Sequence, residues 1–208
     1  MTNSDALDRI YVIDDSVPMP FRQELYSRLL SVNWKYEGVS ASLLENSRTL
    51  NFVMKNFKDT PDKDPNAFLQ RYLETLWKQH IGPLVSQMFH YSPQQIGLHH
   101  VYGNFSAWGD HSPIHQDISP TGNKKMITAI FYPNIEWSPE WGAETIFVND
   151  EKTDIIRSVL PKPGRVLLFD GAYYHAMRPP TRMAPIPRMS LAYKIEIIDN
   201  VNTNNAKH

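Results

Sequence analysis

The sequence predicts a mainly β domain in which a jelly-roll core is backed by N-terminal helices. The first 95 residues contain segments with a helical spacing of apolar residues, whereas the next hundred contain about eight short β-rich runs. Sixteen prolines cut the chain into short segments, which suits a strand-rich core better than a helical bundle. A chain of 208 residues can also bury a substantial hydrophobic core, so one α+β domain is the expected organisation.

The N-terminal third is expected to support this core. Residues 10–14 form a β-branched and aromatic run that predicts a strand, and residues 18–30 have the apolar spacing of a helix. A second helix is predicted over residues 67–79. Gly82 and Pro83, which follow it, should break or kink the helix, and residues 84–89 are a candidate for its continuation. Residues 34–38 and 48–54 are candidate strands, and residues 39–63 are the best candidate for a mobile lid.

The residues that follow are predicted to form the jelly-roll core. Its expected strands include residues 96–103, 126–132, 142–148, 165–169, 173–176 and 188–196. A further strand is expected at or beside residues 115–117, and residues 154–160 are expected to form a short strand or a connector. We therefore expect a single domain over residues 1–208, with α-rich support in 1–95, the jelly-roll core in 96–197 and a flexible tail in 198–208.

Composition excludes several classes of function. The 21 basic and 22 acidic residues nearly balance, so no nucleic-acid partner is expected. The absence of cysteine excludes disulfides, thiolate metal sites and a cysteine nucleophile. The polar N-terminus lacks a signal core, and no apolar run approaches the roughly 18 residues of a membrane span. We expect a cytoplasmic protein without a membrane partner.

Three side chains form a candidate metal site. His115 and Asp117 stand at positions i and i+2, which on a strand places both on one face. His175 follows 60 residues later, after a strand and an Asp-Gly turn. His-x-Asp is common by chance, but two histidines and one carboxylate in one pocket form the facial triad of non-haem iron oxygenases. We predict that these three residues bind the metal and form the catalytic centre.

Arg188 and Ser190 give a second, independent signal. Both open the last predicted strand, and their spacing places them on the same face. A guanidinium group with a hydroxyl beside it is suited to binding a carboxylate bidentately. A surface arginine at the start of a strand is the alternative interpretation.

Residues 96–197 resemble the Fe(II)/2-oxoglutarate-dependent oxygenases, and within them the prolyl-4-hydroxylase-like branch. The matching residues are His115-x-Asp117, Trp137 to Thr145, Pro163 to Phe169, His175 and Arg188-x-Ser190. Ala143 departs from the branch, which usually has a second glycine there, and its small methyl group should leave the site intact. The branch often has lysine in place of Arg188, which weakens the inference of a peptidyl-proline substrate.

The resemblance implies a fold, cofactors and residue roles. The fold is a double-stranded β-helix whose open end holds Fe(II) through His115, Asp117 and His175. The cosubstrates are 2-oxoglutarate and O2, with succinate and CO2 as products, and ascorbate is an expected stimulant. Arg188 and Ser190 would bind the far carboxylate of 2-oxoglutarate, and Tyr102 is a further candidate contact. Because related halogenases lack a carboxylate at the position of Asp117, the resemblance favours hydroxylation, or desaturation or ring closure, over halogenation.

Several nearby residues could be mistaken for ligands. His99 and His100 should point to opposite faces of one strand, so at most one faces the pocket. His111 is interpreted as a residue of the pocket rim or surface, because Pro113 argues against a helical pair with His115. Trp108 and Trp141 are candidates for the mouth of the pocket, with packing as the alternative. Arg178 and Arg182 are candidates for contact with an anionic substrate, with a solvated surface position as the alternative.

The function predicted first is hydroxylation of an unactivated C–H bond in a small metabolite, such as an amino acid, a sugar derivative or a biosynthetic intermediate. A prolyl or other protein side-chain hydroxylase is the alternative within the same class, and its partner would be a peptide or protein. A cupin-like jelly roll that binds a metal or ligand without oxygen chemistry is the alternative from another class. Arg188 with Ser190 separates the two classes, because a simple metal-binding barrel needs no carboxylate clamp.

Overall fold

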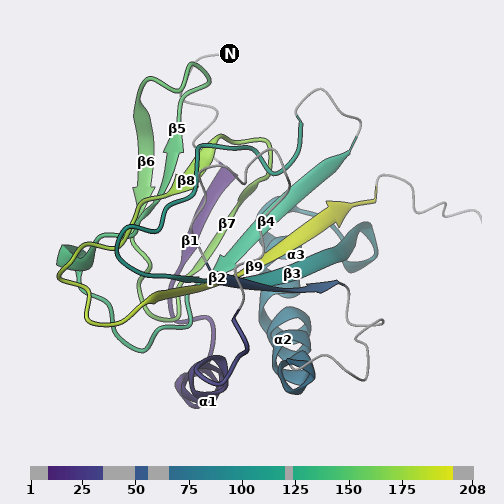
Figure 1. Cartoon of the computed structure of the whole chain (residues 1–208). Coiled ribbons are helices and arrows are strands. Elements are labelled where there is room, and N and C mark those ends of the chain that lie inside the picture. The colour runs from purple at the N-terminus through teal and green to yellow at the C-terminus, as the bar shows by residue number, and fades with distance from the viewer. Residues whose placement is uncertain (1–8, 35–49, 56–65, 120–123, 199–208) are drawn as a thin grey trace, which may run out of the picture.

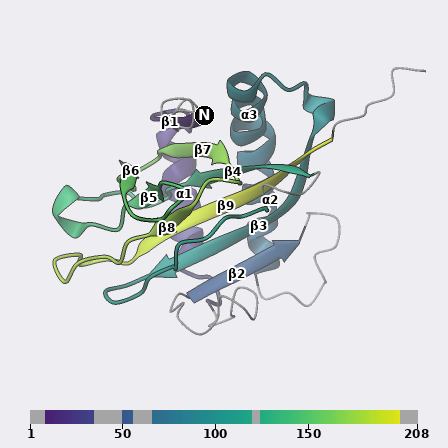
Figure 2. The same cartoon turned by 90° about the horizontal axis from the view of Figure 1, so that it is seen from above.

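The computed structural model describes residues 9–34, 50–55, 66–119 and 124–198, with the backbone alone for residues 50–55. Two antiparallel sheets face each other (Figures 1 and 2). The large sheet has the order β1-β7-β4-β9-β3-β2, and the small sheet has the order β6-β5-β8. The strands are β1 (Ile10–Ile13), β2 (Leu50–Lys55), β3 (Ile96–Ser106), β4 (Lys125–Phe131), β5 (Thr145–Val148), β6 (Ile155–Val159), β7 (Val166–Asp170), β8 (His175–Met177) and β9 (Arg188–Ile197).

Successive side chains of the central strands point to opposite faces of the large sheet. On β9, the buried side chains of Met189, Leu191, Tyr193 and Ile195 join the core cluster that contains the helices. The intervening residue Ala192 belongs to the second cluster, which also contains residues of β5 and β6. One face of the large sheet therefore packs on the helices, and the other faces the small sheet.

The helices cover the first of these faces, as Figure 1 shows for α1 and α2. Buried leucines of both helices, including Leu25, Leu29, Leu73 and Leu76, join the core cluster of that face. The helical elements are α1 (Met19–Leu29), η2 (Ala67–Leu69), α2 (Gln70–Leu76), η3 (Trp77–Ile81), α3 (Gly82–Phe89), η4 (Pro93–Gln95) and η5 (Pro139–Trp141). No helix in the described ranges is both long and apolar enough to cross a membrane. The predicted jelly roll backed by helices is confirmed.

The sequence predicts that Gly82 and Pro83 break or kink the second helix, and the structure shows no break. The helical path continues from α2 into α3 through the π-helical turn η3. Proline has no N–H to donate to the carbonyl four residues earlier, and its ring crowds that carbonyl. A widened π turn before Pro83 accommodates both effects, and it leaves Gly82 close to Trp77, whose carbonyl oxygen lies 3.1 Å from where a Cβ would stand.

Three predicted strands differ in the structure. Residues 115–117 form no strand, only an isolated antiparallel bridge between His115 and His175. The strand expected from residue 142 begins at Thr145, because Gly142 and Ala143 both have positive φ and turn the chain. The strand expected at 173–176 is observed at 175–177.

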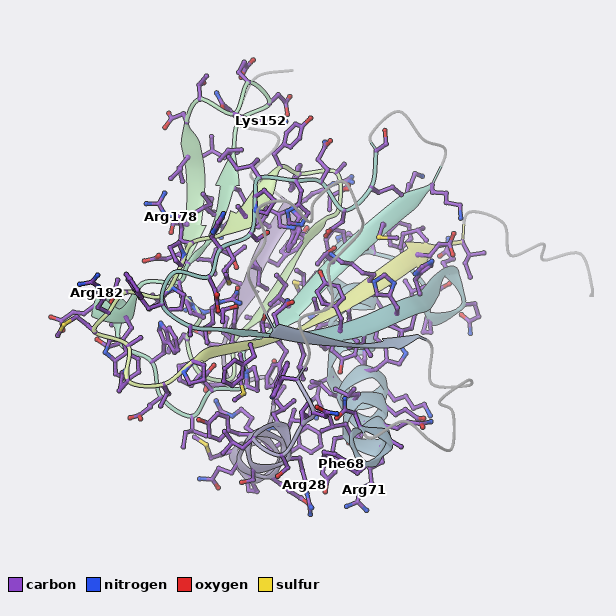
Figure 3. All side chains as sticks on the ribbon, viewed as in Figure 1. Arg28, Phe68, Arg71, Lys152, Arg178 and Arg182 are labelled. Carbon is purple, nitrogen blue, oxygen red and sulfur yellow. The ribbon has the colours of Figure 1, made fainter. Side chains whose placement is uncertain are left out.

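The other predicted strands and both main helices are present with shifts at their ends. Residues 35–38 of one candidate strand, the lid segment 39–63 outside β2, and the tail from residue 199 lie outside the described residues. Figure 3 shows two groups of labelled side chains at the margins of the described part. Arg28, Phe68 and Arg71 lie on the helical side, and Lys152, Arg178 and Arg182 lie on the side of the small sheet.

Candidate active site

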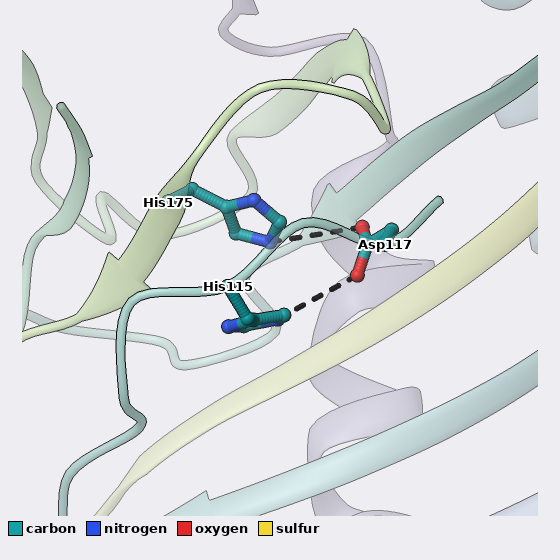
Figure 4. A group of neighbouring side chains, drawn as sticks. All are labelled: His115, Asp117 and His175. Carbon is teal, nitrogen blue, oxygen red and sulfur yellow. Dashed lines mark ion pairs between the residues drawn. The ribbon is translucent and has the colours of Figure 1, made fainter. Parts of the chain in front are cut away.

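His115, Asp117 and His175 converge between the two sheets, although they come from a loop and from β8 (Figure 4). One ligand atom from each lies within 4.8 Å of the others. The Nε2 atom of His115 lies 3.6 Å from Asp117 Oδ1, and the Nε2 atom of His175 lies 3.6 Å from Asp117 Oδ2. This set of two imidazoles and one carboxylate could hold a metal ion.

The backbone fixes the position of all three residues. His115 and His175 exchange both backbone hydrogen bonds of their bridge, with N···O distances of 3.0 and 2.9 Å. The Asp117 N–H donates to the carbonyl of Gly171 at 2.8 Å. Gly171 permits this approach, since a Cβ there would lie 3.3 Å from the Asp117 Cβ and 3.1 Å from the Met126 carbonyl oxygen. A side chain at position 171 would therefore push the loop and its carboxylate away.

The hydrogen bonds of the two histidines suit metal binding. The Nδ1 atom of His115 lies 2.9 Å from the Pro113 carbonyl oxygen, and that of His175 lies 2.9 Å from the Tyr173 carbonyl oxygen. Because a carbonyl can only accept, Nδ1 is the protonated nitrogen in each ring. The Nε2 lone pairs then face Asp117, which is the arrangement that metal-ligating histidines usually have. The donor set therefore fits a divalent iron.

Electrostatics favour the charge states that a metal requires. Burial lowers the pKa of His175 to about 4, against the opposing effect of Asp117, so its imidazole is neutral at pH 7. Burial alone would raise the pKa of Asp117, but the positive charge of Lys194 holds it well below its ordinary value. A neutral imidazole and an ionised carboxylate are the forms that bind metal.

Arg188 lies at the other end of the same cavity, 2% exposed, with Ser190 beside it. Its guanidinium donates to the Ala143 carbonyl at 3.1 Å, to Ser190 Oγ at 3.0 Å and to Thr145 Oγ1 at 3.3 Å. These partners are neutral, and no carboxylate of the described residues pairs with Arg188. Burial accordingly lowers the pKa of this guanidinium. A buried cation held in this way is suited to receive a carboxylate from a ligand.

Residues of both sheets line the cavity, including His175 of β8 and Arg188 of β9. Five of the six predicted site residues line the cavity, namely Tyr102, His115, His175, Arg188 and Ser190. The sixth, Asp117, is not part of the lining but lies 3.6 Å from both His115 and His175. Tyr102 lines the cavity, and burial raises the pKa of its hydroxyl, so it is present as a neutral phenol. Other lining residues include Asn104, Ser112, Pro113, Ile130, Thr145, Ala176, Met177, Ala192 and Lys194.

The predicted orientation of His99 and His100 is wrong. His99 and His100 do not point to opposite faces, since a β-bulge at this point brings their Nδ1 atoms within 2.6 Å of each other. Trp108 and Trp141 do not line the cavity. Trp108 is 60% exposed and lies under the Arg182 guanidinium at 4.4 Å, whereas Trp141 packs edge-on against Trp137.

Sequence reasoning missed Lys194 and Thr128. Lys194 is buried on β9, and its Nζ forms an ion pair with Asp117 Oδ2. Thr128 Oγ1 donates to the same oxygen and lies 3.2 Å from the Lys194 Nζ. The sequence does contain a signal for Lys194, since residues 188, 190, 192 and 194 share one face of the strand. The prediction of a shared face covered only Arg188 and Ser190.

Gly142 is the backbone position on which the Arg188 contact depends. Its φ of 65° and ψ of −135° lie in a region open to glycine alone, and a Cβ there would lie 3.1 Å from Thr181 Cγ2. We expect Gly142→Ala to destabilise the fold by about 1–3 kcal/mol. The next carbonyl, that of Ala143, orients Arg188, so 2-oxoglutarate binding should also weaken. Denaturant unfolding and ligand titration measure the two effects.

Gly109→Ala is the matched control for this prediction. Gly109 also has a positive φ, of 87°, but no atom lies within 4 Å of its missing Cβ. This variant should show a backbone cost without any change in 2-oxoglutarate binding. Unchanged stability of Gly142→Ala would contradict the steric argument.

A double-stranded β-helix with two histidines and a carboxylate at its open end is the architecture of a non-haem iron oxygenase. Residues 98–195 match the family model of the 2OG-Fe(II) oxygenase superfamily. That segment belongs to this superfamily, and the protein is a dioxygenase that uses Fe(II) and 2-oxoglutarate. None of the curated proteins matches the sequence.

Solved structures share the fold at low sequence identity. A prolyl hydroxylase from Trichoplax adhaerens, in complex with a hypoxia-inducible-factor peptide, is 15% identical with a TM-score of 0.65, over 92% of this chain and 84% of that one. The carbocyclase SnoK of nogalamycin biosynthesis is 9% identical with a TM-score of 0.63, over 94% and 84% of the chains. HygX from Streptomyces hygroscopicus, with nickel and 2-oxoglutarate bound, is 14% identical with a TM-score of 0.62, over 94% and 87%.

Proposed function

We propose that the protein hydroxylates an unactivated C–H bond of a small metabolite, with His115, Asp117 and His175 as the ligands of Fe(II). The observation that carries this proposal is the shared cavity, which joins the three ligand side chains to the buried Arg188. When bound there, iron supplies the activation of O2 that couples decarboxylation of 2-oxoglutarate to C–H oxidation.

The side chains contribute binding and orientation. Arg188 pairs with the far carboxylate of 2-oxoglutarate, and Ser190, already bonded to Arg188 at 3.0 Å, adds a hydroxyl to the same carboxylate. Tyr102 gives a further contact from β3, where it lines the cavity. Burial of these groups excludes water, so that the charged contacts are stronger than they would be in solvent.

The burial of the metal ligands supports a small substrate. The reacting carbon must come close to the three ligands, and the side chains of His175 and Asp117 are only 6% and 5% exposed. The second candidate is a hydroxylase of peptide or protein side chains. It is supported by the similar fold of the Trichoplax prolyl hydroxylase, which was solved with a peptide, whereas the similar fold of SnoK supports a biosynthetic substrate.

A turnover screen tests the proposal. The protein is supplied with Fe(II), 2-oxoglutarate and ascorbate, and succinate is measured with panels of small metabolites and of peptides. We expect succinate and a product heavier by one oxygen with a member of the small-molecule panel. Asp117→Ala serves as the inactive control.

Each other outcome has a defined meaning. Turnover with peptides alone would replace the small-metabolite proposal by the second candidate. If 2-oxoglutarate neither binds nor turns over with any panel member, the cupin-like binding module is the better description.

A further inference from the structure

Asn104 on β3 is a polar residue of the cavity to which the proposed chemistry gives no role. It lines the cavity together with Tyr102, Arg188 and Ser190. Every other polar side chain of the lining has a hydrogen bond or an ion pair within the described residues. Within the same ranges the Asn104 amide has no such partner. Its N–H donors and its carbonyl oxygen are therefore available to a molecule that enters the cavity.

The pairing of β3 with β9 places Asn104 beside the proposed carboxylate clamp, Arg188 and Ser190. Asn104 lies directly opposite Ser190. Residues that pair in this way have side chains on the same face of the sheet, with Cβ atoms about 4.5–5.5 Å apart. Asn104 is therefore a cross-strand neighbour of the hydroxyl that accepts from the Arg188 guanidinium. Tyr102, which lies opposite Ala192, is one step further from Arg188 along the same strand pair.

The clamp by itself leaves one acceptor position of a bound carboxylate without a donor. A guanidinium has five N–H groups, and three of those of Arg188 donate to Ala143, Thr145 and Ser190, which leaves two for a ligand. Because the Ser190 oxygen accepts from Arg188, its own O–H can add a third donor. A carboxylate has about four lone-pair positions. The fourth position can accept from a further N–H on the same face of the sheet.

Burial makes this further donor important. Arg188 and Ser190 are both 2% exposed, so water has little access to the end of the cavity at which they lie. A carboxylate that enters this end loses its hydration, and an oxygen lone pair without a protein donor is then unfavourable. An amide N–H at position 104 compensates the lost hydration without adding a charge to the cavity.

We propose that Asn104 is a cosubstrate-binding residue whose side-chain amide donates to the far carboxylate of 2-oxoglutarate, beside Arg188 and Ser190. This inference rests on the proposed function, in which Arg188 and Ser190 bind that carboxylate. Asn104 strengthens the selection of a 2-oxo acid that ends in a carboxylate, because an N–H donor gains no hydrogen bond from an apolar group in the same place.

Binding of two 2-oxo acids tests the proposal without turnover. Mn(II) replaces iron, oxygen is excluded, and calorimetry measures the affinities for 2-oxoglutarate and for 2-oxopentanoate, in which a methyl group replaces the far carboxylate. Weak binding of 2-oxopentanoate is measured by its competition with 2-oxoglutarate. We expect Asn104→Leu to lower the affinity for 2-oxoglutarate about 10- to 150-fold, the range of one hydrogen bond to a charged group. The affinity for 2-oxopentanoate should be nearly unchanged.

Two further variants separate this contact from a structural role. Asn104→Asp keeps the shape of the side chain but replaces its N–H donors by a carboxylate, so 2-oxoglutarate binding should weaken at least as much as in Asn104→Leu. It also tests the proposal if the leucine variant does not fold. Ser106→Ala is the matched control, because Ser106 is a buried polar residue of the same strand that does not line the cavity. Its Oγ has no hydrogen-bond partner among the described residues, so its removal should change neither affinity.

Other results would overturn the proposal. Equal losses of affinity for both 2-oxo acids in Asn104→Leu would assign a structural role to Asn104. An unchanged preference for 2-oxoglutarate in that variant and in Asn104→Asp would show that the amide does not contact the far carboxylate. Failure of the proposed clamp itself appears differently, since the wild-type protein would then bind 2-oxoglutarate and 2-oxopentanoate equally well.

Discussion

Replacing Arg188 by methionine is expected to lower the affinity for 2-oxoglutarate by about 100- to 4,000-fold while leaving metal affinity nearly unchanged. The guanidinium is 2% exposed, so a carboxylate that pairs with it is shielded from water. Loss of one partner of a buried ion pair costs about 3–5 kcal/mol, and each 1.4 kcal/mol is tenfold in affinity. None of the three proposed metal ligands is among the hydrogen-bond partners of Arg188, which is why metal binding should be spared.

Calorimetric titration with 2-oxoglutarate in the presence of Mn(II) measures the first effect, and titration with Mn(II) alone measures the second. Arg71→Ala removes an exposed arginine on the helical side of the molecule (Figure 3), and it should change neither affinity. Equal losses in both titrations of Arg188→Met would show that Arg188 supports the cavity as a whole and does not act as a carboxylate clamp.

The parts of the site that could be predicted from the sequence depend on the spacing of residues close together in the chain. Arg188 and Ser190 were predicted to share a face because strand residues two apart do so, and their guanidinium and hydroxyl lie 3.0 Å apart. The convergence of His115 and Asp117 was also predicted, but from a strand at or beside them that the described residues do not contain. The bridge to His175 and the hydrogen bond from Asp117 to Gly171 produce the same convergence from a loop.

Features that depend on distant chain segments could not be predicted. The β-bulge beside His100 reverses the expected orientation of one ring, and its register is set by pairing between β3 and β9. The partnership of Lys194 with Asp117 joins β9 to a loop, and no spacing in the sequence encodes it. Position 143 was identified as a departure from the family pattern, but its positive φ of 64° appears only in the structure.

Replacing His175 by glutamine is expected to have the largest effect on metal binding. Glutamine has similar bulk, but it lacks the Nε2 lone pair that the Tyr173 carbonyl orients toward Asp117. Loss of a group that only supports a ligand already costs up to about 100-fold in metal affinity, so loss of one of three ligands should exceed that. Mn(II) titration followed by electron paramagnetic resonance measures the change directly.

Thermal unfolding gives an independent measurement of the same loss. A metal that binds only the folded protein raises its melting temperature, and this shift should disappear in His175→Gln. His111→Gln is the matched control, because His111 lies four residues from His115 but does not line the cavity. That variant should keep the metal-dependent shift. If His111→Gln loses the shift while His175→Gln retains it, the third ligand is not His175, and the imidazole that Phe169 packs against at 4.7 Å has a structural role alone.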